Sequence, residues 1–193
     1  HTAASQTPMN HSAHGDASAH GAHGSQHQAH GNHGSEAPPT KAVEVATVDH
    51  LQAPAPTTLP PKHKVVEAKL VLGGDMARYV WHIDGKAIHE SKAIEIQEGD
   101  IIRYTLENSS MMHHPMHLHG HFFRVLNAAG ESSPLKHTVD VPPHSSRTIE
   151  WLANEPGFWM LHCHNLYHMH SGMARVLKYS SFIPKAEIHH LQN

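Results

Sequence analysis

Residues 161–173 read LHCHNLYHMHSGM and contain Cys163, the only cysteine in a chain of 193 residues. His168 and Met173 follow Cys163 at equal intervals of five positions. An upstream run, HHPMHLHGH at residues 113–121, supplies further imidazoles. A β-sandwich brings distant strand ends together, so we expect these two runs to meet in space.

Short apolar runs alternate with turn residues from about Lys64 onward, a pattern typical of an all-β sandwich. Turns are expected where Gly, Pro, Asn or Asp cluster, as at Gly73-Gly74 and Asp84-Gly85. The expected strands are 64–72, 77–83, 93–97, 101–107, 119–126, 137–141, 147–152, 158–163 and 173–179. Helix signals are weak. We therefore expect one all-β domain over residues 62–183 and a loosely held tail at 184–193, with room for a helical turn at 186–191.

Residues 1–61 show almost no hydrophobic periodicity, and Gly, Ser, Ala, Gln, Pro and His dominate them. Such a segment cannot bury enough apolar area to offset its ordering entropy, so it is expected to be disordered. Its prolines from Pro38 to Pro61 indicate an extended linker, with one short strand at Val43–Val48. Its recurring histidines predict either a metal-binding tract or only a solvated linker. They are His11, His14, His20, His23, His27, His30 and His33.

Composition excludes several classes of function. Charged residues are few and the formal net charge is −3, so neither nucleic-acid binding nor a polybasic membrane surface is indicated. No apolar stretch is long enough for a membrane span, and membrane insertion is not expected. The chain begins at His1 rather than Met, which indicates an exported mature protein whose leader has been removed, although an artificial start explains this equally well.

The donor types favour copper. A thiolate is a soft ligand and imidazole a borderline one, which disfavours calcium and magnesium, and one thiolate, two imidazoles and a distant thioether form the trigonal site of blue-copper centres. The ligands expected here are His114, Cys163, His168 and, as the weak axial ligand, Met173. The alternative is that Cys163 is a small buried hydrophobe and that Met173 packs the core.

The two runs also resemble the copper motifs in the last domain of multicopper oxidases, particularly the bacterial copper-resistance oxidases. The likeness covers roughly residues 78–179 and includes Tyr79-Val80-Trp81, Met111-Met112 and the run KHTVDVPP at 136–143. It implies a cupredoxin fold, a Greek-key β-sandwich. It further implies type 1 copper ligands at His114, Cys163, His168 and Met173, a type 2 ligand at His117, and type 3 ligands at His119, His162 and His164.

The chain departs from that family in having room for only one such domain. In the oxidases a separate cupredoxin domain supplies two further His-x-His pairs, so half of the trinuclear cluster is missing here. Reduction of dioxygen to water is therefore not expected from this chain alone. One cupredoxin domain behind a His-rich leader instead resembles the small periplasmic copper-tolerance cupredoxins of the CopI type.

Strand alternation predicts a second set of donors. If Cys163 points toward the mononuclear copper, His162 and His164 project from the opposite side, and His117 and His119 likewise share one face. Such a four-imidazole patch could hold additional copper. The alternative is a set of surface histidines without metal.

Three functions remain open. The first is periplasmic copper binding for tolerance, by sequestration and oxidation of Cu(I), with copper ions and a redox protein or copper chaperone as partners. The second is a pure electron carrier, which needs an exposed His168 edge. The third is an oxidase piece that another polypeptide completes. Candidate ligands for Cu(I) uptake are Met111, Met112, Met116, Met169, His113, His121 and His170.

Overall fold

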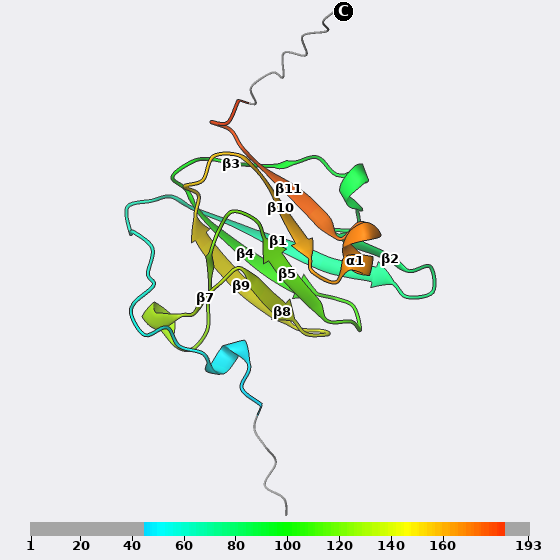
Figure 1. Ribbon diagram of the computed structural model, residues 1–193, viewed down its shortest axis with the longest axis horizontal. Helices are drawn as coiled ribbons and strands as arrows, with labels where there is room; N and C mark the ends of the chain where they lie inside the picture. The colour runs from blue at the N-terminus through cyan, green and yellow to red at the C-terminus, as the bar shows by residue number, and fades with distance from the viewer. Residues whose placement is uncertain (1–44, 184–193) are drawn as a thin grey trace, which may run out of the picture. The chain divides into compact units, whose positions relative to one another are not determined.

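The computed structural model describes residues 45–183 and shows two packed β-sheets with few helices (Figure 1). One sheet has the strand order β2-β1-β4-β9-β6-β7 and the other β3-β11-β10-β5-β8. The first sheet comprises β1 (Val65–Asp75), β2 (Val80–Ile83), β4 (Ile101–Asn108), β6 (Phe123–Val125), β7 (Leu135–Lys136) and β9 (Ser146–Leu152). The second comprises β3 (Ile94–Ile96), β5 (His114–Leu118), β8 (Thr138–Val141), β10 (Phe158–Cys163) and β11 (Ala174–Tyr179). The expected all-β sandwich is confirmed.

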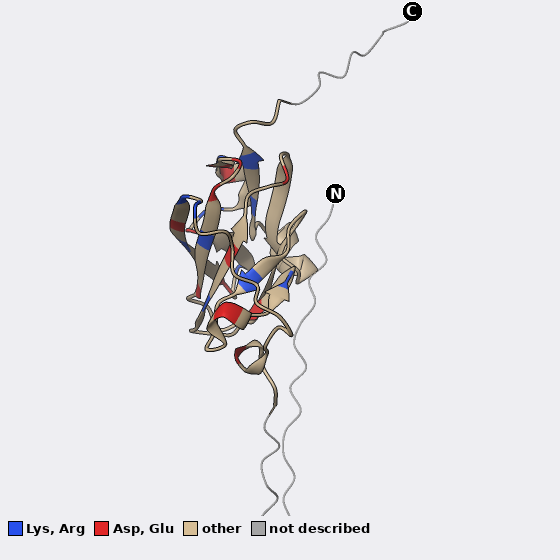
Figure 2. Cartoon of the chain, turned by 90° about the vertical axis from the view of Figure 1, so that its left-hand side faces the viewer, with Lys and Arg blue, Asp and Glu red and all other residues tan. Residues whose placement is uncertain are grey.

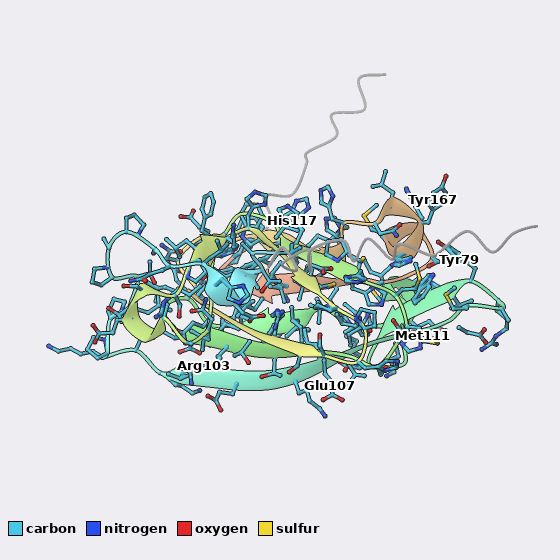
Figure 3. The ribbon with its side chains drawn as sticks, turned by 90° about the horizontal axis from the view of Figure 1, so that it is seen from below. Tyr79, Arg103, Glu107, Met111, His117 and Tyr167 are labelled. Atoms are coloured by element: carbon cyan, nitrogen blue, oxygen red, sulfur yellow. The ribbon has the colours of Figure 1, made fainter. Side chains whose placement is uncertain are left out.

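The chain crosses repeatedly between the sheets. β1 pairs with β4 in parallel and β11 with β3 in parallel, while the other pairs are antiparallel. Side chains alternate between the core and the outside, so that Ile102, Tyr104 and Leu106 of β4 are buried while Arg103 and Glu107 reach the outer face. Figure 3 shows the latter two on one outer face and His117 of β5 on the other.

The turn expected at Gly73-Gly74 is wrong, because β1 continues through both glycines to Asp75. Gly74 lies opposite Trp81 across the β1·β2 pair. A Cβ built on Gly74 would lie 2.1 Å from Cε3 of Trp81, so a larger residue there would displace the indole. The glycine thus serves close packing rather than a turn.

Two local expectations around the ligand runs are also wrong. The expected strands do not include residues 114–118, which form β5 although its Pro115 lacks a backbone N–H. The strand expected at 119–126 is a turn at His119-Gly120 followed by the short β6. The loop after Cys163 contains a short helix, α1 (Leu166–His170), and the side chain of Asn165 caps it by accepting from the N–H of Tyr167.

Residues 45–61 contact the sandwich although they were expected within the disordered segment. No strand forms in the described part of Val43–Val48, and Val48–His50 is a 3₁₀ turn. The Nδ2 of Asn127 donates to the carbonyls of Val48 and Leu51, at 2.9 Å each. The seven histidines of the expected metal-binding tract and the expected helical turn at 186–191 lie outside the described residues.

Basic and acidic side chains are interspersed over the described residues (Figure 2). Within that part of the chain, no helix is long and apolar enough to span a bilayer.

Candidate metal centre

The two histidine-rich runs are brought together by the pairing of β5 with β10. The register places His117 opposite His162 and Met116 opposite Cys163. Cys163 and His114 point into the sandwich and are fully buried. His117 and His162 lie on the other side of the same two strands, so strand alternation separates an inner donor set from an outer one.

The inner donor set consists of His114, Cys163 and His168. The Sγ of Cys163 lies 3.8 Å from Nδ1 of His114 and 3.6 Å from Nδ1 of His168, and the two nitrogens are 3.1 Å apart. A trigonal ion with bonds of about 2.0 Å to nitrogen and about 2.3 Å to sulfur needs sulfur–nitrogen separations of about 3.7 Å and a nitrogen–nitrogen separation of about 3.5 Å. These atoms therefore fit a first-row transition metal with adjustments of a few tenths of an ångström.

Backbone hydrogen bonds tie Met173 to this set. Its N–H donates to the carbonyl of His168 at 3.0 Å, and its carbonyl accepts from the N–H of Cys163 at 3.0 Å. The residue is fully buried and immediately precedes β11. The structure thus brings Met173 to the loop that supplies Cys163 and His168, and its axial role stays a prediction.

A buried polar relay fixes the orientation of His114. Its Nε2 lies 2.7 Å from the hydroxyl of Ser110, which donates to Oδ1 of Asn108 at 2.9 Å. Because the hydroxyl proton is given to Asn108, Nε2–H of His114 donates to Ser110, which leaves a lone pair on Nδ1 facing Cys163. Asn108 is held in turn by its Nδ2, which donates to the carbonyls of Met112 and Val141. Sequence reasoning missed Ser110 and Asn108.

Burial keeps the inner donors neutral in the absence of a metal. It lowers the pKa of His114 to about 4, with a smaller contribution from the positive charge of His168, and it lowers the pKa of His168. Burial raises the pKa of the Cys163 thiol to about 11. A bound transition ion reverses this preference for the thiol, because a coordinated sulfur is deprotonated.

Trp81 covers both imidazoles of the inner set. Its ring stacks on His168 with centroids 4.1 Å apart and meets His114 edge-on at 5.2 Å. His168 is 0% exposed. Gly172 allows the ligand loop to approach, since a Cβ there would lie 2.9 Å from the carbonyl oxygen of Trp81. The inner site is therefore dry, and His168 presents no ring edge to solvent.

The outer donor set lies on the opposite side of Cys163. One ring nitrogen each from His117, His119 and His162 lie within 4.8 Å of one another. Nε2 of His119 is 2.9 Å from Nε2 of His162, and the ring of His164 lies 5.6 Å from that of His117. The four expected imidazoles are therefore together.

Backbone carbonyls select the tautomers of the outer set. Nδ1 of His117 lies 2.7 Å from the carbonyl of His137, and Nδ1 of His162 lies 2.9 Å from the carbonyl of Cys163. A carbonyl only accepts, so both Nδ1 atoms carry the proton and both Nε2 atoms keep a lone pair for a metal. Burial lowers the pKa of His117, His119 and His162, which also favours the neutral, ligating form.

His137 is a fifth imidazole beside this set that sequence reasoning did not propose as a ligand. Its ring meets that of His117 edge-on at 5.2 Å, and Thr138 Oγ1 lies 2.9 Å from its Nδ1 and 3.1 Å from Nδ1 of His117. The run at 136–143 was noted in the sequence, but only the β5·β8 pairing shows that it borders the outer set.

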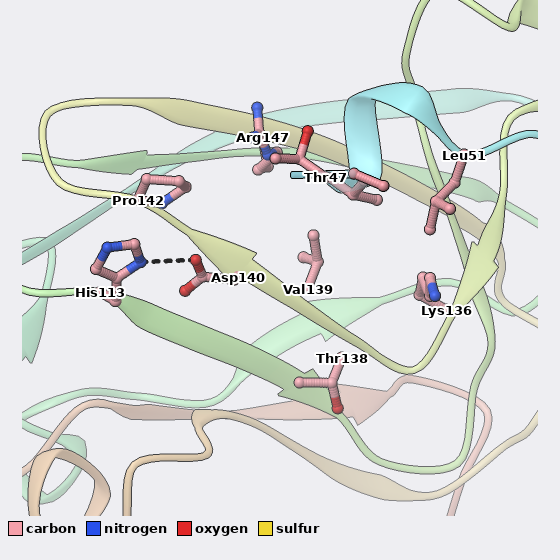
Figure 4. A pocket seen from close by; sticks show the side chains of 11 residues that line it. Thr47, Leu51, His113, Lys136, Thr138, Val139, Asp140, Pro142 and Arg147 are labelled. Atoms are coloured by element: carbon pink, nitrogen blue, oxygen red, sulfur yellow. Dashed lines mark hydrogen bonds and ion pairs between the residues drawn. The ribbon is translucent and has the colours of Figure 1, made fainter. Parts of the chain in front are cut away.

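The candidate uptake ligands are scattered. Met116 packs in the core, and Nε2 of the buried His121 is bonded to the hydroxyl of Tyr179 at 2.7 Å. His113 pairs with Asp140 at 2.7 Å and lines a separate surface pocket with Thr47 and other residues (Figure 4). Met111 is exposed, and Met112, Met169 and His170 are at least partly accessible.

Comparison with known proteins identifies the family. Residues 59–181 match the family model described as multicopper oxidase. The chain belongs to the multicopper oxidase family. As a copper-binding domain of this type, it is 36% identical over 135 residues to multicopper oxidase MmcO of Mycobacterium tuberculosis, an alignment that covers 70% of this chain and 27% of that protein. It is 38% identical over 110 residues to a copper resistance protein A homolog of Pseudomonas syringae pv. tomato, covering 57% of this chain and 19% of the relative.

Solved multicopper oxidases share the fold of this domain. McoA of Aquifex aeolicus superimposes with a TM-score of 0.53 at 25% identity, covering 65% of this chain and 31% of that one. The blue copper oxidase of Nitrosomonas europaea gives 0.56 at 21% identity, covering 64% and 47%. This multicopper oxidase domain therefore spans only about a quarter of the length of the first of the relatives above and less than half of each of these structures.

Proposed function

We propose that this multicopper oxidase domain is a periplasmic copper-tolerance protein that sequesters copper and oxidises Cu(I) to Cu(II). The observation that supports this is the placement of two donor sets on opposite sides of β5 and β10. Cys163 belongs to the inner set, and its carbonyl accepts a hydrogen bond from His162 of the outer set. One set suits a resident redox copper. The other suits copper as cargo or substrate.

The inner set is proposed as a type 1 site in which His114, Cys163, His168 and Met173 would hold the copper ion. Copper held there supplies a one-electron acceptor that alternates between the cupric and cuprous states. The chain contributes the orientation of His114 through Ser110 and the exclusion of water by Trp81.

The outer set is proposed as the place where copper ions are held and Cu(I) is oxidised. Neutral imidazoles bind copper, and His117, His119, His162 and His164 offer four within contact of one another. The ring Nδ1–H of His162 donates to the carbonyl of Cys163, which gives a short route from this set to the inner sulfur. One electron leaves the Cu(I) substrate, yielding Cu(II), and an external redox protein that accepts one electron finally receives it.

The two competing functions fit less well. The exposed His168 edge expected for a pure electron carrier is wrong, because His168 is 0% exposed. A pure electron carrier also leaves the outer set without a role. An oxidase piece agrees with the short coverage of the relatives, but it requires a second polypeptide to supply the remaining histidines.

Copper counting with an electronic spectrum tests the proposal. The unaltered protein is expected to bind several copper ions and to show the thiolate-to-copper absorption band, while Cys163→Ser should lose the band and keep the copper of the outer set. Replacing both His119 and His164 by Ala should abolish Cu(I) oxidation under anaerobic loading with an added acceptor, and the band should survive. His89→Ala removes an exposed imidazole outside both sets and outside the candidate uptake ligands, and is the matched control.

The outcomes separate the three functions. A single copper per chain without Cu(I) oxidation would favour the electron carrier. Activity only in the presence of a second polypeptide would favour the oxidase piece. A protein that stays colourless in cupric salt would contradict the inner site altogether.

A further inference from the structure

The burial of His168 raises the question of how electrons leave the inner site. Electron transfer to an external acceptor needs close electronic contact, and His168 is 0% exposed. His114 is equally buried, and Cys163 faces the core. Neither imidazole ligand can therefore touch an acceptor directly.

Two aromatic side chains lead from His168 toward the surface, beside the partly exposed Asn165, whose Nδ2 lies 3.4 Å from Nε2 of His168. Trp81 is 0% exposed and stacks on His168 at 4.1 Å with the planes 30° apart. Tyr79 is 44% exposed, and its ring lies edge-on to Trp81 at 5.9 Å and 6.2 Å from His168. Figure 3 shows Tyr79 at the end of the molecule that also displays Tyr167, with His117 nearer the middle.

The backbone holds both rings in place. Gly74 lies opposite Trp81, and any Cβ there would strike the indole, so the ring is confined between β1 and His168. Tyr79 has a φ of 53°, a left-handed conformation that is uncommon for a bulky residue. Packing and this strained turn thus fix a continuous contact from His168 through Trp81 to an exposed tyrosine.

We propose that Trp81 and Tyr79 form the electron route between the inner copper site and the surface. This inference rests on the proposed function, because it requires redox-active copper at Cys163. One electron leaves the cuprous site and reduces one external acceptor. No bond forms or breaks, no proton moves, and neither ring is itself oxidised, because the rings provide only electronic coupling.

Stopped-flow oxidation of the reduced, copper-loaded full chain by ferricyanide tests the route. The electron reduces one Fe(III) to Fe(II), and recovery of the thiolate-to-copper band reports the rate. Tyr79→Leu fills similar space without an aromatic ring and is expected to slow the recovery severalfold. Tyr79→Phe keeps the ring and should retain the original rate. Tyr167→Leu removes another exposed tyrosine, on the same helix as His168, and should also leave the rate unchanged.

Two further measurements distinguish an electron route through Tyr79 from a role in which Tyr79 only shields His168 from solvent. The band and the reduction potential should be the same in Tyr79→Leu as in the unaltered protein. If Tyr79 only shields His168, Tyr79→Leu would react at the original rate or faster, which would overturn the inference. A slower rate matched by a shift in potential would overturn it as well. Absence of the band in the unaltered protein would instead refute the proposed copper site, and the route with it.

Discussion

Ser110→Ala tests whether the relay beneath His114 sets its affinity for copper. The Ser110 hydroxyl accepts from Nε2–H of His114 at 2.7 Å and from the N–H of Met112 at 3.2 Å, and it donates to Asn108. Ser110 is 8% exposed and His114 is 0% exposed, so water cannot easily replace the lost oxygen. Leaving a buried donor without a partner costs about 1–3 kcal/mol. Loss of such a partner of a metal-binding histidine lowers metal affinity by about 10–100-fold.

The assay combines denaturant unfolding of the metal-free protein with copper competition titration. Ser109→Ala is the matched control, because Ser109 is exposed and the Leu72 carbonyl that its hydroxyl contacts also accepts from the Ser109 N–H at 2.9 Å. The control should change stability by no more than about 0.5 kcal/mol. If Ser110→Ala keeps both the unfolding midpoint and the copper affinity of the unaltered protein, the relay does not orient His114 and the reasoning fails.

Three further outcomes are expected. Since burial lowers the pKa of His114 to about 4 from 6.5, the unfolded chain binds more protons between these values, and this imidazole alone should remove about 3 kcal/mol of the metal-free protein's stability as the pH falls through this window. The other imidazoles with a lowered pKa add to the loss in the same direction. Denaturant midpoints across the window check this, and a flat profile would contradict the buried neutral imidazole. Removing residues 1–44 should lower the copper count and leave the thiolate band intact, because both donor sets lie within residues 45–183; loss of the band would show that the segment supports the inner site. Gly120→Ala should lower the melting temperature more than Gly85→Ala does. Both glycines have a positive φ, but only at Gly120 would a Cβ clash with Trp159, at 2.6 Å. Equal decreases in melting temperature would mean that the strained backbone alone sets the loss of stability.

The strand pattern and the ligand spacing were predictable because they follow from local regularities. Alternation places Cys163 inside and His162 outside whatever the partner strand is. The short interval from Cys163 to His168 keeps both on one connection. These features required no knowledge of tertiary contacts.

Other features depend on contacts between distant segments and gave no local signal. β5 is defined by its pairing with β8 and β10, which are distant in sequence, and Gly74 was interpreted as a turn because its role is to accommodate Trp81 from a neighbouring strand. The partnership of Ser110 with His114 depends on which rotamer the buried imidazole adopts. The approach of His137 to His117 depends on the β5·β8 pairing.

The register between β5 and β10 controls both donor sets at once. Leu118 lies opposite Leu161, His117 opposite His162, and both leucines are fully buried. A slip of one residue would turn Cys163 outward and His162 into the core, because side chains alternate with a period of two. The apolar partners therefore hold the sulfur and the outer imidazoles in a fixed relation. For this reason, substitutions at these leucines should impair the inner and outer sites together, although neither leucine provides a donor atom.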